Sequence, residues 1–557
     1  MLLPDVLRER ARTAPAATAY LFLDEHGAEV AAISYAGLDE RARTIGARLA
    51  AVTRPGDRAL LVFPSGLDFV AAFFGCLYAG VIAVPVIPPR RGRAHPATHG
   101  IVADCAPAVL LTAGALEVEL PIAERIAVDE VPAHGPALDP KPCAPADPAF
   151  LQYTSGSTGA PKGVVVTHGN LRANQEMIRA AFGHDERSTF VGWAPLYHDQ
   201  GLIGNLLQPL YLGAPCVLMA PLTFIRRPLL WLTAISGYRA HTSGGPNFAF
   251  DACVRHAERA GVPAGLDLSS WRVAFNGAEP IRAETLRRFA ATFAPHGFDP
   301  GALYPCYGLA EATLLVSGSL PGRGARELRA DIAALGAGTL REAARGEPAR
   351  VLVGSGRPAP GVDIRIVDLE SGEPCPPGRI GEIRLAGANI AAGYWRAPDA
   401  TAAVFGGNSL RTGDLGQFVD GELFVTGRRK DLIIVRGRNH YPHDLEHTAQ
   451  AAHPAARAGG TAAFTADDQP VLIQEIERGT EPSAAAEIAG AIRAALLRDH
   501  DLALGALVLT VAGALPKTSS GKIMRSAARA HHLGAGFERW GTPPVEPGRR
   551  VNPGPIH

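Results

Sequence analysis

Short runs of valine, isoleucine and leucine alternate along this 557-residue chain with alanine- and arginine-rich segments whose apolar residues recur at helical spacing. Such alternation is typical of α/β layers built on mostly parallel sheets. The stretch 69–87 approaches membrane-spanning length, but glycines and a proline interrupt it. We therefore predict a buried helix there that turns into a buried strand. Further predicted strands are 58–63, 108–111, 214–219 and 271–275, and predicted helices are 68–78, 249–260 and 282–293.

The residue pattern of the sequence changes after about residue 350. Glycine and proline turns separate predicted strands at 362–368, 381–385 and 422–426, which indicates a small β-rich subdomain. Beyond residue 427 a compact α/β unit follows, with predicted strands at 432–435, 471–475 and 506–511 and helices from about His443 and Ser483.

The predicted fold class is therefore α/β, with parallel and mixed sheets and helices in a large N-terminal domain and a small mobile α/β domain behind it. We expect the N-terminal domain at 1–429, with its β subdomain at about 350–429, and the mobile domain at 430–540. The proline-, glycine- and arginine-rich tail at 541–557 is expected to be disordered.

Charge and cysteine content exclude several classes of protein. Lysine plus arginine and aspartate plus glutamate each number 54, so neither a nucleic-acid binder nor a polybasic membrane anchor is indicated. The seven scattered cysteines form no CxxC pair, which argues against a zinc site or a secreted disulfide framework. The first residues contain no signal-type apolar core, so we expect a cytoplasmic protein with no membrane span.

The strongest local motif is Tyr153-Thr-Ser-Gly-Ser-Thr-Gly-Ala-Pro-Lys162-Gly163, between the apolar segments 149–151 and 164–166. Small residues let the backbone approach a polyphosphate, whose oxygens accept hydrogen bonds from N–H and hydroxyl groups. The motif lacks the GxxxxGK[ST] pattern of a Walker A loop, and the alternative is a Ser/Gly turn that binds nothing. The predicted phosphate-binding residues are Thr154, Ser155, Gly156, Ser157, Thr158, Gly159 and Lys162.

With this loop, the sequence resembles the adenylate-forming superfamily of acyl-CoA synthetases, peptide-synthetase adenylation domains and luciferases. Six further segments follow in the superfamily's order over nearly the whole chain. They are Trp193-Ala-Pro-Leu-Tyr-His198, Asn276-Gly277-Ala278-Glu279-Pro, Tyr307-Gly308-Leu-Ala-Glu311-Ala-Thr313, Arg411-Thr-Gly-Asp414, Thr426-Gly-Arg428-Arg-Lys430-Asp and Leu515-Pro-Lys-Thr-Ser-Ser-Gly-Lys522-Ile.

The resemblance implies that a carboxylic acid attacks the α-phosphate of ATP, and it gives a role to each motif. Glu311 is expected to bind Mg²⁺, Lys522 to reach the reacting phosphate from the mobile domain, and His198 to gate the acid site. Asp414 and Arg428 are expected to bind the ribose, and Lys430 to act as the hinge. Tyr307 is expected to stack on adenine, whose site also includes Asn276, Gly277, Ala278, Glu279, Gly308 and Thr313.

Each of these residues also has a structural interpretation. Taken alone, His198 could be a core histidine, Asp414 a turn residue, and Arg428 or Lys522 a solvated charge. The shared order and spacing of the motifs favour the functional interpretation.

Three features resemble fatty acyl-AMP ligases more than acyl-CoA synthetases. Ala310 stands where most relatives have threonine, so a phosphate contact is expected to pass to Thr313 or to the loop at 153–158. The segment Gly437-Arg-Asn-His-Tyr-Pro442 is close to that branch's sequence after the hinge. The stretch 315–356 is longer than in ordinary relatives, and in the ligase branch such an insertion holds the small domain away from the pose that accepts CoA. The alternative for this stretch is a variable surface loop.

We therefore predict that the chain activates a fatty acid with ATP and Mg²⁺ and passes it to the phosphopantetheine thiol of a separate acyl carrier protein, because no carrier segment is evident here. One alternative is a fatty acid–CoA ligase. Another is adenylation of an aryl or amino acid, for which Asp251 is the nearest candidate to pair an α-amino group. An inactive nucleotide-binding scaffold is disfavoured by the joint presence of Glu311, Asp414, Arg428 and Lys522.

Overall fold

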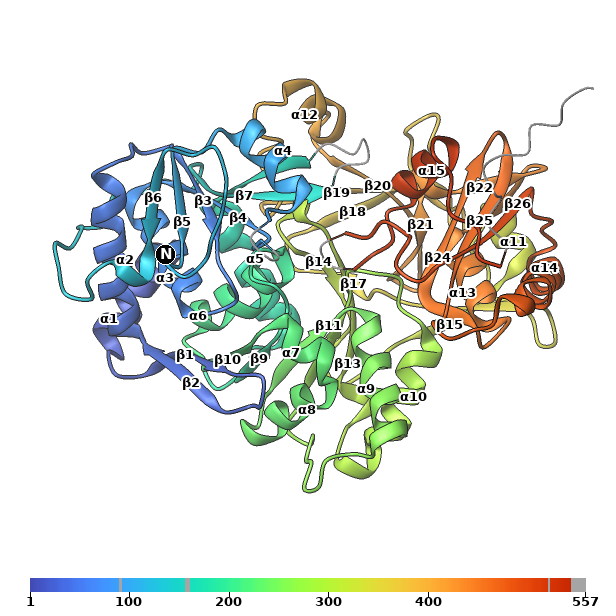
Figure 1. The fold of residues 1–557 in the computed structure, drawn as a ribbon, viewed down its shortest axis with the longest axis horizontal. Coiled ribbons are helices and arrows are strands. Elements are labelled where there is room, and N and C mark those ends of the chain that lie inside the picture. Colours follow the sequence, from blue (N-terminus) through green and yellow to red (C-terminus); the bar gives the residue numbers. More distant parts are fainter. Residues whose placement is uncertain (90–92, 156–160, 519–520, 542–557) are drawn as a thin grey trace, which may run out of the picture. The chain divides into compact units, whose positions relative to one another are not determined.

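The structure is a computed structural model that describes residues 1–89, 93–155, 161–518 and 521–541. The chain divides into two compact units, unit 1 from Met1 to Arg429 and unit 2 from Lys430 onward. Sheets and helices alternate in both units, so the predicted α/β class is confirmed (Figure 1). In the described parts of the chain, no helix is both long and apolar enough to cross a membrane.

The larger sheet of unit 1 has the strand order β17-β14-β13-β12-β11-β9-β10-β1-β2. Strands β13 to β1 in this order run parallel, and antiparallel pairs lie at both edges. The strands are β1 (Thr18–Leu23), β2 (Glu29–Ser34), β9 (Phe190–Gly192), β10 (Cys216–Met219), β11 (Thr242–Gly245), β12 (Val273–Asn276), β13 (Leu303–Gly308), β14 (Leu315–Gly318) and β17 (Arg357–Pro358).

Alternate residues of this sheet enter two different cores. Val191, Val217 and Ala274 pack with the aromatic residues of the helices that connect β10 to β13. Phe190 and Leu218 point into the core that is shared with the second sheet. The connecting helices are α7 (Pro221–Arg226), α8 (Pro228–Gly237), α9 (Asn247–Ala260) and α10 (Ala283–Phe293).

The second sheet of unit 1 has the order β6-β5-β3-β4-β7-β8 and is parallel except for the β7–β8 hairpin. The predicted helix and strand at 69–87 are confirmed as α3 (Leu67–Ala79), buried from Phe69 onward, and β4 (Ile82–Val86), buried throughout. The other elements are β3 (Arg58–Val62), β5 (Val109–Thr112), β6 (Glu124–Ala127), β7 (Pro148–Ser155), β8 (Pro161–Thr167), α1 (Leu3–Thr13), α2 (Tyr35–Ala50), α4 (Pro96–Cys105), α5 (His168–Phe182), η2 (Gln200–Leu207) and α6 (Gln208–Leu212).

The β-rich segment that closes unit 1 forms an antiparallel sheet in sequence order, β18-β19-β20-β21. Strands β18, β19 and β21 lie at the predicted positions, whereas β20 was not predicted. Its strands are β18 (Asp363–Val367), β19 (Gly381–Ala386), β20 (Leu410–Val419) and β21 (Glu422–Arg428), with α12 (Pro398–Phe405) between β19 and β20.

The long stretch 315–356 begins with β14 of the larger sheet, and its part at 326–353, which we call the insertion, folds as a small substructure. Strand β15 (Glu327–Asp331) pairs with β16 (Ala349–Val353), and α11 (Ile332–Gly336) lies between them in sequence. Arginines fasten the insertion to other parts of unit 1: Arg287 of α10 lies 3.2 Å from Glu327, and Arg326 lies 2.6 Å from Asp420 in the β20–β21 turn. The insertion therefore has its own hydrogen-bonded structure.

Unit 2 has a three-stranded sheet in the order β24-β25-β26 with apolar residues on both of its faces. The predicted strands at 432–435, 471–475 and 506–511 are confirmed as β22 (Ile433–Val435), β25 (Gln469–Ile476) and β26 (Ala506–Thr510). The predicted helices are α13 (Pro442–Ala451) and α14 (Ala485–His500). Strands β23 (Arg438–His440) and β24 (Ala456–Ala466) and helix α15 (Arg525–Leu533) complete the unit. The predicted disordered tail lies outside the described residues after residue 541.

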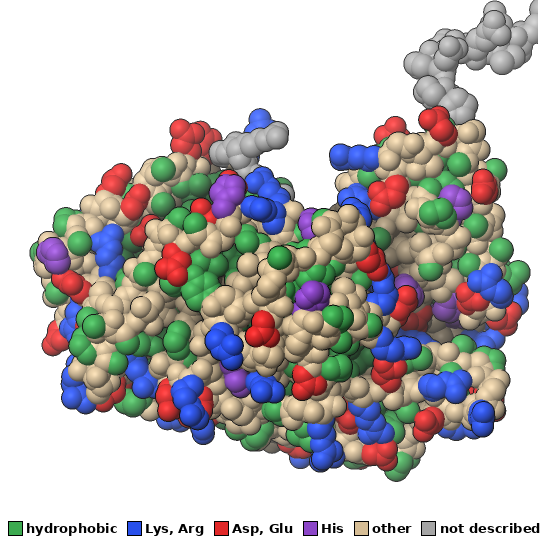
Figure 2. Space-filling view, turned by 90° about the horizontal axis from the view of Figure 1, so that it is seen from below, with side chains coloured by type: hydrophobic (Ala, Val, Ile, Leu, Met, Phe, Trp, Pro, Cys, Tyr) green, Lys and Arg blue, Asp and Glu red, His purple; other side chains and the backbone are tan. Residues whose placement is uncertain are grey.

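Charged side chains of both signs are interspersed over the face of the molecule that Figure 2 shows. This distribution agrees with equal numbers of basic and acidic residues.

Candidate active site

The carboxyl ends of parallel strands β11, β12 and β13 lie at one edge of the larger sheet, where ligands bind in open α/β sheets. Strand β12 ends at Asn276, which is fully buried. Neither oxygen nor nitrogen of its side-chain amide has a hydrogen-bond partner among the described residues. Buried amides are rarely left unpaired, so Asn276 has capacity to bind a ligand or water.

The turn after β12 has little room for side chains. A Cβ atom at Gly277 would lie 2.9 Å from the Cys306 carbonyl oxygen, so this position requires glycine. Ala278 follows with a positive φ of 68°, and Glu279 accepts a hydrogen bond of 2.7 Å from the Phe248 backbone N–H at the start of α9. The backbone of this turn therefore packs closely against the end of β13 and is held in place by the Glu279 hydrogen bond.

Tyr307, Asp414 and Arg428 form a hydrogen-bonded group. Asp414 is buried on β20, directly opposite Arg428 on β21. Its carboxylate accepts a hydrogen bond of 2.7 Å from the Tyr307 hydroxyl and one of 3.0 Å from the Arg428 Nε. Burial and the nearby Asp414 raise the pKa of Tyr307 well above its usual value, so its hydroxyl remains a donor. Three residues from separate predicted motifs are thus brought together.

The turn after β13 carries Glu311 on the single helical turn η5 (Ala310–Ala312). A Cβ atom at Gly308 would lie 1.8 Å from the Leu314 carbonyl oxygen, so only glycine allows this turn to close. Burial raises the pKa of Glu311, and the Tyr394 hydroxyl donates to its carboxylate over 2.9 Å. A cation close to Glu311 would favour its ionised form.

Thr313 does not occupy the role predicted for it. Its side chain is fully buried, at a φ of 67°, and its hydroxyl donates to the Asn389 carbonyl oxygen over 2.6 Å. The hydroxyl thus stabilises the turn, and a phosphate contact that replaces the one missing at Ala310 does not fit this conformation. The loop at 153–158 remains as the other predicted source of that contact.

The phosphate loop joins the strands of the β7–β8 hairpin, in which Thr154 pairs with Lys162. The predicted residues Gly156, Ser157, Thr158 and Gly159 lie outside the described residues, as does the side chain of Ser155. The ammonium of Lys162 lies 5.0 Å from the centre of the Tyr394 ring. Lys162 and Glu311, predicted from motifs about 150 residues apart in the sequence, therefore meet the same tyrosine.

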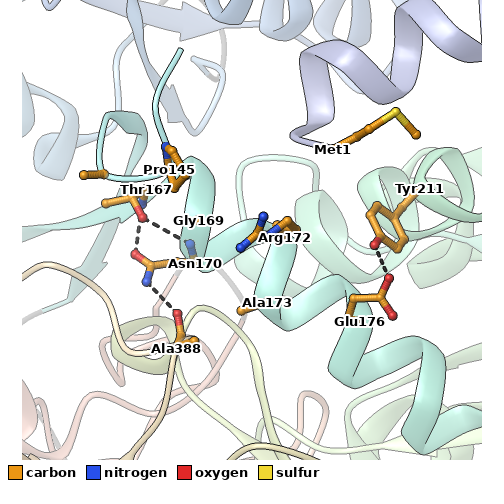
Figure 3. Close-up of a pocket in the computed structure, with 11 residues that line it drawn as sticks. Met1, Pro145, Thr167, Gly169, Asn170, Arg172, Ala173, Glu176, Tyr211 and Ala388 are labelled. Carbon is orange, nitrogen blue, oxygen red and sulfur yellow. Dashed lines mark hydrogen bonds between the residues drawn. The ribbon is translucent and has the colours of Figure 1, made fainter.

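The buried amide of Asn170 binds the segment that precedes Tyr394, and Figure 3 shows its contact with Ala388. Asn170 caps α5 together with Thr167, and its amide donates to the carbonyl oxygens of Ala388 and Ile390 over 2.9 and 2.8 Å. The same figure shows a surface pocket of about 520 Å³ that Asn170 lines with Arg172 and Glu176. None of its lining residues belongs to the predicted site, so this pocket is separate from the candidate active site.

His198 lies just before the π-helix η2, a rare element that is frequent at functional sites. Its Nδ1 lies 2.5 Å from Asp199, and the imidazole is 26% exposed, so it is not an enclosed core histidine. The Nε2 of the neighbouring Gln200 is buried without a hydrogen-bond partner among the described residues.

Lys522 lies in a small hairpin of unit 2 that a bridge between Lys517 and Ile523 closes. The Leu515 N–H, before the hairpin, donates over 2.9 Å to the carboxylate of the fully buried Glu475. Arg525, after the hairpin, donates to both carboxylate oxygens of Glu446 over 2.6 and 2.7 Å and lies 3.2 Å from Asp431. Both ends of the hairpin are therefore attached within unit 2. The contact of Arg525 with Asp431 involves the residue next to the predicted hinge, Lys430.

Sequence reasoning missed Tyr394, the buried Asn170 and the Arg525 ion pairs. The only available signal for Tyr394 was an aromatic pair, Tyr394-Trp395, in a loop otherwise rich in small residues. The charges around Arg525 are far apart in sequence, so no local pattern connects them.

Comparison with known proteins agrees with this geometry. The family model described as "AMP-binding enzyme" matches residues 7–395, and one described as "Disco-interacting protein 2-like, AMP domain" matches residues 430–538. The fold and the site therefore define an AMP-binding, adenylate-forming enzyme.

Curated relatives and solved structures specify the branch. The chain is 42% identical to the medium-chain-fatty-acid–[acyl-carrier-protein] ligase JamA of Moorena producens, over 96% of each chain. It is 33% identical, with a TM-score of 0.87, to a structure from a study of fatty acyl-adenylate ligases from E. coli and L. pneumophila, over 96% of this chain and 98% of the other. A fatty acyl-adenylate ligase from L. pneumophila in complex with acyl adenylate and pyrophosphate is 37% identical, with a TM-score of 0.75 over 97% of this chain and 98% of that one. The chain belongs to the fatty acyl-AMP ligases.

Proposed function

We propose that this chain uses ATP to convert a fatty acid to its acyl-adenylate, and then transfers the acyl group to the phosphopantetheine thiol of a separate acyl carrier protein. The observation that carries the proposal is the group formed by Tyr307, Asp414 and Arg428 at the carboxyl edge of the sheet. A buried carboxylate beside an aromatic ring suits the ribose and base of a nucleotide. The names of the relatives supply the fatty acid and the carrier.

In the first step, an oxygen of the fatty-acid carboxylate attacks the α-phosphorus, and the bond from that phosphorus to the β-phosphate oxygen breaks. The carboxylate is already ionised near neutral pH, so no general base is required. The obstacle is repulsion between anions, and the residues needed are donors and cations. We assign the departing pyrophosphate to Lys162 and the loop at 153–158, and the α-phosphate to Lys522.

Magnesium fits this site through a single carboxylate. Among the described residues, no cluster of three or more His, Cys, Asp or Glu side chains could hold a metal ion by itself. Mg²⁺ usually binds through one or two carboxylates plus substrate phosphates, which suits the partly buried Glu311. When bound there with ATP, Mg²⁺ would neutralise phosphate charge.

In the second step, the carrier's thiolate attacks the acyl carbonyl carbon, and AMP leaves with the bonding electrons. The hinge that we assign to Lys430 serves this step, because the thiol needs a path to the adenylate. The amino-acid alternative is less suitable, because Asp251 is paired with Arg255 at 2.6 Å and also faces Arg288 at 3.7 Å. A carboxylate with two arginine neighbours is poorly placed to bind an α-amino group.

All seven cysteines lie in the described ranges and are free thiols. Free thiols are typical of a reducing compartment, where ATP is also available. We therefore place the reaction in the cytoplasm.

The half-reaction is testable by pyrophosphate exchange. The purified protein with ATP, Mg²⁺ and radiolabelled pyrophosphate should exchange label into ATP only when a medium- or long-chain fatty acid is present, and mass spectrometry should detect the acyl-adenylate. The panel includes acetate, aryl acids and amino acids as controls. Exchange with an amino acid but with no fatty acid would overturn the substrate assignment, and exchange with no acid would overturn the enzyme assignment.

The acceptor is testable by competition. With equal concentrations of carrier protein and CoA, mass spectrometry of the products should show acyl-carrier far in excess of acyl-CoA. Shortening the insertion within 327–353 should raise CoA use about tenfold if it restrains unit 2, since a population bias of about 1.4 kcal/mol has that effect. The variant Arg326→Ala, which loosens the insertion at Asp420 without shortening it, is the milder companion. Efficient acyl-CoA formation by the intact protein would favour the CoA ligase alternative.

A further inference from the structure

Tyr394 presents different parts of its side chain to two groups of opposite charge. Its hydroxyl donates to the Glu311 carboxylate over 2.9 Å. The Lys162 ammonium lies 5.0 Å from its ring centre, within the distance at which a cation is attracted to an aromatic face. One side chain thus connects the base of the phosphate loop to the acidic turn after β13.

The backbone around Tyr394 is attached to the same two places. Hydrogen bonds from Val165 to Gly393 and from Trp395 to Gly163, of 2.9 and 2.8 Å, add this segment to strand β8 beside Lys162. On the other side, the Ala391 N–H donates to the Glu311 carbonyl oxygen over 3.0 Å. A shift of the segment would therefore change its distance from both Lys162 and Glu311.

The ring itself is also fixed. It packs edge-to-face on Phe405 of α12, with the ring centres 5.3 Å apart, and the Tyr394 backbone N–H donates to the Thr401 hydroxyl over 2.9 Å. Side chains that are locked by packing hold a site to the accuracy that chemistry requires. Helix α12, which carries none of the predicted site residues, therefore supports the site through Tyr394.

We propose that Tyr394 is a positioning residue that sets the distance between the Lys162 cation and the Glu311 carboxylate, so that both meet one polyphosphate. Its hydroxyl orients the carboxylate toward the cation that accompanies ATP, and its ring face orients the lysine toward the phosphates that leave. This inference rests on the proposed function for the identity of the ligand, but the two functions of the side chain can be tested separately.

Two variants separate the two contacts. Tyr394→Phe removes the hydroxyl and keeps the ring, whereas Tyr394→Leu removes both. The matched control is Tyr238→Phe, because Tyr238 also donates to a glutamate, Glu29, over 2.6 Å but lies outside the candidate site. The measurements are equilibrium binding of α,β-methylene-ATP with and without Mg²⁺, and the half-saturating concentrations of Mg²⁺ and pyrophosphate in the exchange reaction.

Tyr394→Phe should raise the half-saturating Mg²⁺ concentration about tenfold and weaken binding of the analogue with Mg²⁺, while its binding without Mg²⁺ stays unchanged. Tyr394→Leu should in addition raise the half-saturating pyrophosphate concentration about tenfold, and Tyr238→Phe should change neither. Equal weakening with and without Mg²⁺, or wild-type behaviour of both Tyr394 variants, would overturn the inference. Because analogue binding requires no fatty acid, this result stands apart from a failure of the exchange assay.

Discussion

Replacing Lys522 with alanine should lower the rate of acyl-adenylate formation about 10²–10³-fold, the loss typical of one donor to a transition state. The ammonium is assigned to charge that develops on the α-phosphate, so kcat should fall much more than the KM for ATP rises. Folding should be little affected, because the substitution keeps the backbone hydrogen bonds of Lys522, which donates to the Thr518 hydroxyl and accepts from the Thr518 N–H. Single-turnover formation of acyl-adenylate, followed by rapid quench, measures the effect.

The matched control for this variant is Lys517→Ala. Lys517 lies in the same hairpin, but its ammonium donates to the Gly459 carbonyl oxygen over 2.8 Å. The Lys517→Ala variant should lower the melting temperature but change the rate of the chemical step little. Near-normal adenylate formation by the Lys522 variant, or an equal loss in both variants, would remove Lys522 from its proposed role.

Replacing Asp414 with alanine should lower kcat/KM for ATP about 10²-fold, chiefly by raising KM. The carboxylate accepts hydrogen bonds from Tyr307 and Arg428, and its loss removes both of these contacts as well as the proposed ribose acceptor. A hydrogen bond to a charged group contributes about 1.5–3 kcal/mol, which corresponds to roughly 10–150-fold in affinity.

Deoxynucleotides make this test specific for the ribose. Wild-type protein should discriminate against 2′- or 3′-deoxy-ATP, whereas the Asp414→Ala variant should use ATP and the preferred deoxy analogue with similar KM. Asp420→Ala is the control, because Asp420 lies in the turn that joins the same two strands and pairs with Arg326. Retained discrimination in the Asp414 variant would contradict a direct contact with the sugar.

The sequence predicted the elements whose apolar pattern is strong and missed those whose pattern is weak. Helix α3 and strand β4 were correctly predicted because almost every residue in them is apolar. Strand β24 was missed because its segment, Ala456–Ala466, is rich in alanine and glycine, which favour strands little. The insertion was noticed only by its length, since β15 and β16 have five residues each, which is too short for a clear apolar pattern.

In the candidate site, too, residues in clear local motifs were predicted and the others were missed. Tyr307, Asp414 and Arg428 were each predicted from a local motif, and the structure places them in contact. Tyr394 has no distinctive motif, and its importance comes from neighbours at positions 162 and 311 that only the tertiary fold brings close. Thr313 was assigned to the wrong partner because the sequence does not reveal that its backbone turns the hydroxyl toward Asn389.

The fastening of the Lys522 hairpin has a consequence for the time scale of the reaction. With Leu515 held by Glu475 and Arg525 held by Glu446 and Asp431, the chain on both sides of Lys522 is attached to the rest of unit 2. A free loop moves in nanoseconds to microseconds, whereas a whole domain moves in about microseconds to milliseconds. We therefore expect that the delivery of Lys522 to the nucleotide is as slow as the motion of unit 2. The rate of this delivery should depend on solvent viscosity much more strongly than the rate of a local loop motion would.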